Sequence, residues 1–158
     1  MVLEADTARF LGDKAGLIIG VVGLDGRPFA TRGWGLTVLD RATGRSRLLI
    51  DAAERCLFDH LAGGGAIAVT GSDVPSLRSC QVKGHVEDFD EVTDADIEHS
   101  AHYCAGFFGD IEAADHFPLH LLERIRPDEL AACHFVIEEV YDQTPGPNAG
   151  TPMIEDSP

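Results

Sequence analysis

The stretch that most constrains the fold is residues 77–87, Leu-Arg-Ser-Cys-Gln-Val-Lys-Gly-His-Val-Glu, because apolar and polar side chains alternate along it. Successive side chains of a β-strand point to opposite faces. One face of such a strand carries Cys80, Val82 and Val86. The other face carries Ser79, Gln81, Lys83 and His85. The pattern predicts a half-buried strand of an antiparallel sheet, whose polar face either meets water or lines a ligand groove.

Further strand and turn signals surround this stretch. Runs rich in apolar and β-branched residues predict strands at 15–22, 29–39, 45–50, 66–70 and 133–141, with the stretch above extending to about residue 89. Asp25-Gly26 and residues 40–44 have the composition of tight hairpin turns. Short helices are expected at 7–13, capped by Asp6 or Thr7, at 54–61, within 90–109, capped by Thr93 or Asp94, and at 117–125. About six strands joined by hairpins predict a mainly β fold, an antiparallel barrel with short helices.

The predicted strand 29–39 contains an unusual triplet, in which Gly33 and Gly35 flank Trp34. Glycine weakens a strand unless a ligand, a bulge or a barrel corner brings another backbone close. The sequence leaves these three explanations open. Strict alternation along the strand would place Arg32 and Trp34 on the same face.

A chain of 158 residues fits a single domain, expected over residues 1–142. Residues 143–158 are rich in proline and glycine and predict an extended or mobile tail. No apolar run approaches the roughly 20 residues that cross a bilayer, and the first residues lack the pattern of a secretory signal. The expected location is therefore the cytoplasm, with no membrane partner.

The charge of the chain is strongly acidic, at −15, which disfavours nucleic acid and anionic membranes as partners. Between Arg27 and Lys83, however, eight basic residues stand against five acidic ones. A local cationic zone of this kind suits a small anion such as a phosphate. If their strands are adjacent, Arg32 and Lys83 could hold that phosphate while Trp34 or Gln81 meets a planar ring. Arg55, at the start of a predicted helix, would add positive charge. The alternative is that these are ordinary surface cations.

The cysteines and histidines show no metal-binding spacing. Cys56, Cys80, Cys104 and Cys133 are far apart, which predicts buried free thiols. His99, His102, His116 and His120 match no zinc motif, so no metal site is expected. They are expected to be solvated or core histidines, with haem ligation as a weaker alternative. No nucleophile motif is present, so no catalytic residue is assigned.

Three segments together resemble a known family. They are Ala-Thr-Arg-Gly-Trp-Gly at 30–35, Arg-Ser-Cys-Gln-Val-Lys-Gly at 78–84 and Val-Tyr-Asp-Gln-Thr-Pro-Gly-Pro-Asn-Ala-Gly at 140–150. The chain is similar in element order to the pyridoxamine 5'-phosphate oxidase-like split barrels. The resemblance implies a split β-barrel homodimer with FMN in two grooves at the subunit interface. It implies phosphate contacts for Arg32 and Arg55, and a flavin contact for Gln81.

The chain departs from the oxidase at two places. The oxidase has a serine-arginine-lysine grip at the helix start, where this chain has Ala-Ala-Glu-Arg at 52–55. The oxidase's C-terminal substrate-binding tryptophan and arginine have no counterpart, since Trp34 is the only tryptophan and Arg126 the last arginine. Pyridoxamine phosphate is therefore not the expected substrate.

Two functions follow as expectations. The first is an FMN-dependent oxidoreductase acting on a small molecule that the sequence does not identify. The second is a non-catalytic module that binds or senses flavin, haem or another planar cofactor. The expected cofactor-binding residues are Arg32, Gly33, Trp34, Arg55, Ser79, Gln81 and Lys83.

Overall fold

The computed structural model describes residues 2–23, 25–61 and 64–153. Its elements, in chain order, are α1 (Ala5–Gly12), β1 (Gly16–Val22), β2 (Pro28–Arg32), β3 (Leu36–Asp40), β4 (Arg45–Asp51), α2 (Arg55–Leu61), β5 (Ala66–Ser72), β6 (Ser79–Asp90), α3 (Asp94–Asp115), α4 (Leu119–Leu122), the 3-10 turn η1 (Glu123–Ile125) and β7 (Leu130–Asp142).

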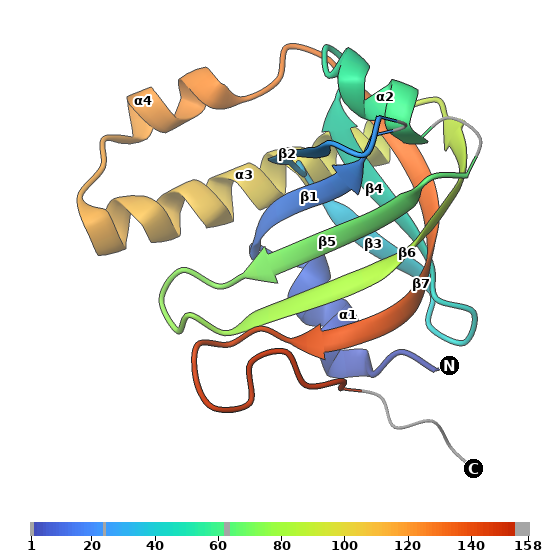
Figure 1. The fold of residues 1–158 in the computed structure, drawn as a ribbon. Helices are drawn as coiled ribbons and strands as arrows, with labels where there is room; N and C mark the ends of the chain where they lie inside the picture. The colour runs from blue at the N-terminus through green and yellow to red at the C-terminus, as the bar shows by residue number, and fades with distance from the viewer. Residues whose placement is uncertain (1, 24, 62–63, 154–158) are drawn as a thin grey trace.

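The strands form one antiparallel sheet in the order β2-β1-β5-β6-β7-β4-β3. The sheet curls around a single core, with β2 and β3 as its two edges (Figure 1). The predicted antiparallel split barrel is confirmed. Its strands number seven rather than six, because the predicted strand 29–39 is divided into β2 and β3.

The division between β2 and β3 occurs at the glycine–tryptophan–glycine triplet. The Gly33 amide donates to the Leu17 carbonyl on β1 at 3.1 Å, and the Trp34 amide donates to the Leu49 carbonyl on β4 at 2.8 Å. The triplet therefore crosses from one sheet edge to the other, and the barrel corner is the correct explanation of the three. A Cβ at residue 33 would lie 3.0 Å from Leu17 Cβ, and Gly35 has a φ of +147°, which disfavours other residues.

The core side of the predicted strand at 77–87 is confirmed, since Cys80, Val82 and Val86 are buried. Strand β6 itself begins at Ser79 and ends at Asp90.

Cys56 is exposed, unlike the other three cysteines, so the expectation of four buried thiols is wrong for Cys56. Burial raises the pKa of Cys80 to about 11 and of Cys133 to about 12, so both are unreactive thiols.

The helices differ from expectation in length and capping. Helix α3 has 22 residues and extends away from the barrel with α4, so it is not short (Figure 1). Its predicted cap Thr93 is confirmed, since Thr93 and Asp96 form a capping box. The cap predicted for α1 is wrong: its N-cap is Glu4, without a side-chain hydrogen bond. Among the described helices, none is long and apolar enough to cross a membrane.

The segment after β7 folds back on the sheet over residues 143–153. The Gln143 amide donates to the Ser79 carbonyl at 2.9 Å, and the Met153 amide donates to the Val140 carbonyl at 2.8 Å. Tyr141 and Pro152 form an isolated antiparallel bridge. These residues are thus not extended, because their backbone donors find acceptors at the ends of β6 and β7. Residues 154–158 lie outside the described part of the chain.

Candidate functional site

Strand pairing brings several predicted site residues onto one outward face of the sheet. A lateral row, here called the outer row, consists of Arg32, Ile18, Thr70, Gln81 and Tyr141, each paired with the next on the neighbouring strand. Directly paired residues point to the same face. Arg32 and Gln81 therefore share that face, at a separation of three strand spacings, or about 14 Å. Strands β2 and β6 are not adjacent, so Arg32 and Lys83 are not neighbours.

Beside the outer row lies a cavity of about 710 Å³, here called the hollow. Its lining includes Gly20, Val22, Pro28, Phe29, Ala30, Ala66, Ala68, Lys83, Glu138 and Glu139. The floor is flat because Gly20, Ala30 and Ala68 have little or no side chain. A Cβ added at Gly20 would meet no atom within 4 Å. The lining is apolar along β1, β2 and β5 and carries its charged side chains on β6 and β7, a combination that is usual in small-molecule sites.

Two polar side chains from β6 line this part of the face. The Gln81 amide Nε2 donates to Thr70 Oγ1 on β5 at 2.9 Å, which leaves its carbonyl oxygen unused by that contact. The Lys83 Nζ lies 4.4 Å from the centre of the Tyr141 ring on β7, a cation–π arrangement. Both residues are half-buried. The predicted positions of Gln81 and Lys83 on the polar face are confirmed.

The end of β2 and the start of α2 are joined by a hydrogen bond, in which Thr31 Oγ1 donates to Glu54 Oε1 at 2.9 Å. This contact connects the segments that carry Arg32 and Arg55, both of which are exposed. Within the described residues, no carboxylate oxygen lies within 4.0 Å of Arg32, Arg55 or Lys83. In a chain with 27 acidic residues, three cations without a carboxylate partner are available to an anionic ligand.

Three other predicted site residues lie elsewhere. Trp34 is 4% exposed and belongs to the hydrophobic core, because the corner turns its side chain inward. The expectation that it shares a face with Arg32 is therefore wrong. Gly33 forms that corner and has no side chain to offer. Ser79 is buried, and its hydroxyl donates to Ser72 Oγ at 2.9 Å rather than facing the hollow.

The sequence reasoning missed Gly20, Thr70 and Tyr141. Their roles depend on which strands are neighbours and in what register, and the pairing of β1 with β5 joins residues some fifty positions apart. No local pattern in the sequence signals this. The only available signal was the small size of Gly20 inside a strand.

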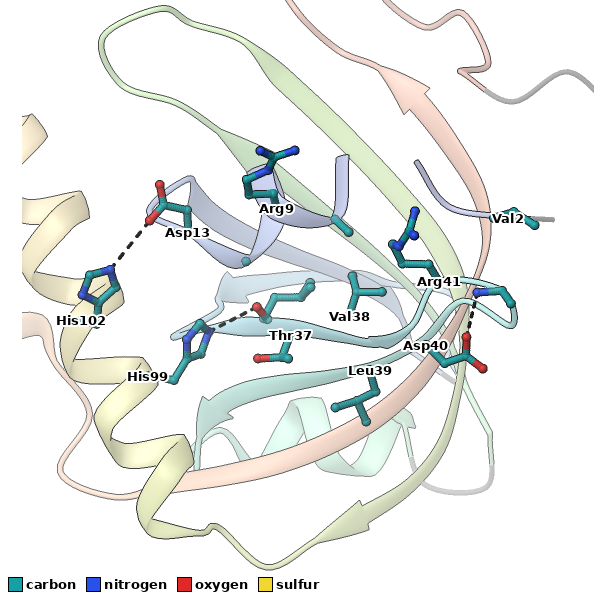
Figure 2. A pocket seen from close by; sticks show the side chains of 14 residues that line it. Val2, Arg9, Asp13, Thr37, Val38, Leu39, Asp40, Arg41, His99 and His102 are labelled. Carbon is teal, nitrogen blue, oxygen red and sulfur yellow. Dashed lines mark hydrogen bonds and ion pairs between the residues drawn. The ribbon is translucent and has the colours of Figure 1, made fainter. Parts of the chain in front are cut away.

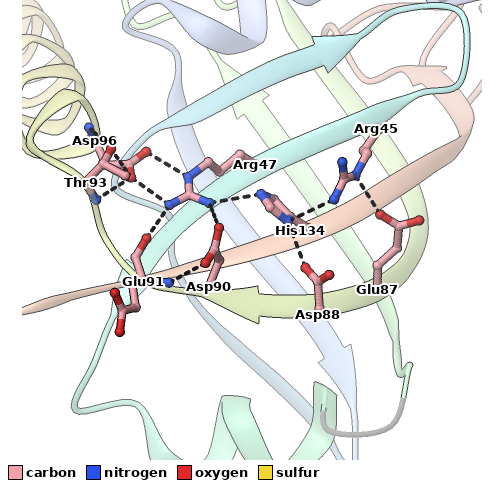
Figure 3. Close-up of polar contacts among 9 residues, drawn as sticks. All are labelled: Arg45, Arg47, Glu87, Asp88, Asp90, Glu91, Thr93, Asp96 and His134. Atoms are coloured by element: carbon pink, nitrogen blue, oxygen red, sulfur yellow. Dashed lines mark hydrogen bonds and ion pairs between the residues drawn. The ribbon is translucent and has the colours of Figure 1, made fainter.

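A separate charged cluster connects the start of α3 to the sheet (Figure 3). Arg47 on β4 donates to both carboxylate oxygens of Asp96, at 2.9 and 2.7 Å, and to the Glu91 carbonyl at 2.7 Å. It also donates to Asp90 at 3.2 Å. The bidentate contact with Arg47 lowers the pKa of Asp96 to about 2. These groups satisfy one another, which indicates a structural role.

His134 on β7 completes the cluster (Figure 3). Its Nε2 lies 2.9 Å from an Arg47 nitrogen, which can only donate, so Nε2 accepts. Its Nδ1 lies 2.8 Å from Asp88 Oδ1, to which it donates when it carries the proton, and 3.3 Å from an Arg45 nitrogen. Since both ring nitrogens are engaged and the residue is 8% exposed, His134 is not available to a ligand.

A second cavity, of about 950 Å³, lies between α1, β3 and α3 and is here called the α1–β3 groove (Figure 2). Val38 and Leu39 give it apolar contact surface, and Arg9, Arg41 and the buried Leu36 also belong to its lining. His99 and His102 reach it from α3. His99 Nε2 lies 3.2 Å from the Leu36 carbonyl, and His102 Nε2 lies 3.8 Å from an Asp13 oxygen.

Comparison with known proteins identifies the fold. No protein-family model matches the chain, and no curated protein does. A crystal structure of a putative pyridoxamine 5'-phosphate oxidase from Lactobacillus delbrueckii matches with a TM-score of 0.55 and 18% identity, over 89% of this chain and 93% of that one. HupZ from Group A Streptococcus matches with a TM-score of 0.56 and 14% identity, over 94% of this chain and 100% of that one. The chain therefore has the split-barrel fold found in pyridoxamine 5'-phosphate oxidase-like proteins.

Proposed function

We propose that the protein binds FMN on the outward face of β1, β5 and β6 and acts as a flavin-dependent oxidoreductase. The observation that carries this proposal is a flat apolar hollow that has Lys83 in its lining and Arg32 on the next row of the same face, both without a carboxylate partner in the described chain. A flat apolar ring joined to an anionic tail is the ligand chemistry that complements such a surface. The resemblance of the sequence to FMN-binding split barrels supports the same assignment.

Residues of this face complement the isoalloxazine ring of FMN, and others are available for its phosphate. The hollow has a volume of about 710 Å³, within the roughly 300–1,000 Å³ usual for cofactor sites. Val22 and Pro28 offer apolar contacts to the ring, while Gln81 and Lys83 offer polar groups. Arg32 and Arg55 would hold the phosphate. When bound, FMN supplies hydride or electron transfer, and the protein supplies orientation and electrostatics.

The phosphate contacts give a direct test. Arg32→Ala and Arg55→Ala should each weaken FMN binding about tenfold or more, since a charge-assisted contact with phosphate is worth about 1.5–3 kcal/mol. The dissociation constant is measured by quenching of FMN fluorescence. Arg126→Ala is the matched control, because Arg126 is exposed, pairs with Glu123 at 3.0 Å beside η1 and does not belong to the lining of the hollow. A wild-type protein that binds no FMN would refute the proposal.

A homodimer is also expected. Ile18 and Val22 on the outward face are 44% and 65% exposed, which leaves apolar surface for a second copy to cover. Sedimentation equilibrium should give twice the 17.0 kDa chain mass, and Val22→Glu should shift the protein toward the monomer. Val2→Glu is the matched control, since Val2 is equally exposed at 65% but lies on α1's side of the molecule. A wild-type monomer at every concentration would contradict the expectation.

The α1–β3 groove favours a second candidate, a haem-binding module. Haem is planar and apolar with two carboxylates, and the groove combines apolar residues with Arg9, Arg41 and two histidines (Figure 2). His102 is the better axial ligand, because His99 is already engaged by a backbone carbonyl. Titration with haem should then give a Soret band that His102→Ala removes and His116→Ala, at the exposed end of α3, retains. Absence of this band in the wild type would eliminate the candidate.

The remaining expectations are a small-molecule substrate, a cytoplasmic location and no nucleic-acid or membrane partner. Turnover with a reduced nicotinamide and oxygen would separate an enzyme from a binding module.

A further inference from the structure

Lys83 lies on the side of the hollow far from Arg32. Its cross-strand neighbours are Ala68 on β5 and Glu139 on β7. Its Nζ rests 4.4 Å from the centre of the Tyr141 ring, so the side chain leans toward β7. Strand β7 is on the opposite side of β6 from β2. The ammonium is thus directed away from the segment that carries Arg32. The two cations would therefore contact different parts of one ligand.

Both carboxylates in the hollow are engaged by other groups. Glu138 Oε1 lies 3.0 Å from His85 Nδ1. Glu139 accepts the hydroxyl hydrogen of Tyr141. Neither carboxylate comes within 4.0 Å of Lys83, although Glu139 is its cross-strand partner. The half-buried ammonium therefore keeps donor capacity for a ligand.

Tyr141 is fixed from several directions. It pairs with Gln81 on β6 and bridges to Pro152 in the returning segment. The hydrogen bond to Glu139 raises the pKa of Tyr141, so the phenol stays protonated. The ring face beneath Lys83 is consequently held in one place, where its negative quadrupole attracts the ammonium.

We propose that Lys83 recognises the carbonyl acceptors of the flavin ring, and that Tyr141 is the positioning residue that holds Lys83 in place. This inference rests on the proposed function, since it requires the flavin ring in the hollow. The ring and the phosphate are then recognised by separate cations: Lys83 binds the ring, and Arg32 and Arg55 bind the phosphate. The segment 142–153 has a role in the same arrangement, because it pins Tyr141 at the end of β7.

Two probes that share the ring separate these roles. Lumiflavin has the isoalloxazine ring without the ribityl phosphate, and FMN has both. Lys83→Met should weaken binding of both probes by the same factor, about tenfold, because a charge-assisted hydrogen bond to the ring is lost. Arg32→Ala should weaken FMN and leave lumiflavin unchanged. Dissociation constants are measured by fluorescence quenching, and thermal melting confirms that each variant is folded.

The positioning role of Tyr141 is tested by a double-mutant cycle with Lys83. Tyr141→Leu removes the aromatic face beneath Lys83 and should weaken lumiflavin binding as much as Lys83→Met does. Tyr141→Phe keeps the aromatic ring and should bind lumiflavin as the wild type does. The double variant Lys83→Met/Tyr141→Leu should bind no more weakly than Lys83→Met alone. A general structural effect of Tyr141 would instead give additive losses.

The outcomes separate the two proposals. If wild-type protein binds neither probe, both proposals are overturned. If it binds FMN and Lys83→Met weakens FMN but not lumiflavin, Lys83 is a phosphate ligand and this inference alone is overturned. Unchanged binding of both probes by Lys83→Met overturns it as well, and additive losses in the cycle overturn the role of Tyr141.

Discussion

Gly20→Leu should abolish FMN binding, with a loss of affinity of more than about 100-fold, or about 2.7 kcal/mol. Gly20 lies in the floor of the hollow, and a Cβ at this position meets no atom within 4 Å. A leucine side chain would therefore extend into the space that the flavin ring needs, without touching the core. Fluorescence quenching of FMN measures the loss.

The fold should tolerate this change. Gly20 is in the middle of β1, and replacing a strand glycine commonly stabilises the strand by about 0.5–1 kcal/mol. Chemical denaturation should show an unfolding free energy equal to or slightly above that of the wild type. The matched control is Gly109→Leu, because a Cβ at Gly109 on α3 also meets open space, far from the hollow. Normal FMN binding by Gly20→Leu would show that the ring lies elsewhere.

Arg47→Met should have the largest effect on stability, with a loss of about 3–5 kcal/mol in the free energy of unfolding. The Arg47 side chain is 11% exposed and that of Asp96 13% exposed. Methionine preserves the apolar stem but removes the donor of the Glu91 carbonyl and the bidentate cation from Asp96, which keeps only its contacts with Thr93. The start of α3 would lose its attachment to β4 (Figure 3). Chemical denaturation monitored by circular dichroism measures this loss.

Arg45→Met provides the matched comparison on the same strand. Arg45 pairs with Glu87 at 3.0 Å, but the two side chains are 45% and 36% exposed. Solvent screens such a pair, so its loss should cost about 0–1 kcal/mol. Equal effects of the two substitutions would show that the Arg47 cluster does not stabilise the fold.

The contribution of Asp96 should also depend on pH in a defined direction. Its folded-state pKa is lowered to about 2, below the ordinary value of 3.8. A carboxyl with a lowered folded-state pKa stabilises the fold above its unfolded-state pKa, and that stabilisation is lost as the pH falls through the folded-state value. The difference in stability between wild type and Arg47→Met should accordingly be full above about pH 4 and shrink between about pH 4 and pH 2. A difference that stays constant to pH 2 would contradict this account.

The sequence determined the local features of this protein. Alternation identified the buried side of β6 at Cys80, Val82 and Val86, and turn chemistry at Asp25-Gly26 identified a hairpin. These features depend on residues a few positions apart, so strand period and turn preference suffice to predict them. The same period failed at Trp34, because the backbone turns a corner there and alternation across a corner has no meaning.

The tertiary structure alone decided the composition of the candidate site. The outer row and the hollow require β1 to pair with β5, and β5 with β6, in a specific register. That register placed Gly20, Thr70 and Tyr141 beside Gln81 and Lys83, and it separated Lys83 from Arg32. Pairing between distant segments is selected by burial of the whole core rather than by any local sequence preference. The cationic residues of the candidate site could thus be predicted from the sequence, whereas their places on the sheet, with Lys83 apart from Arg32, depend on the folded structure.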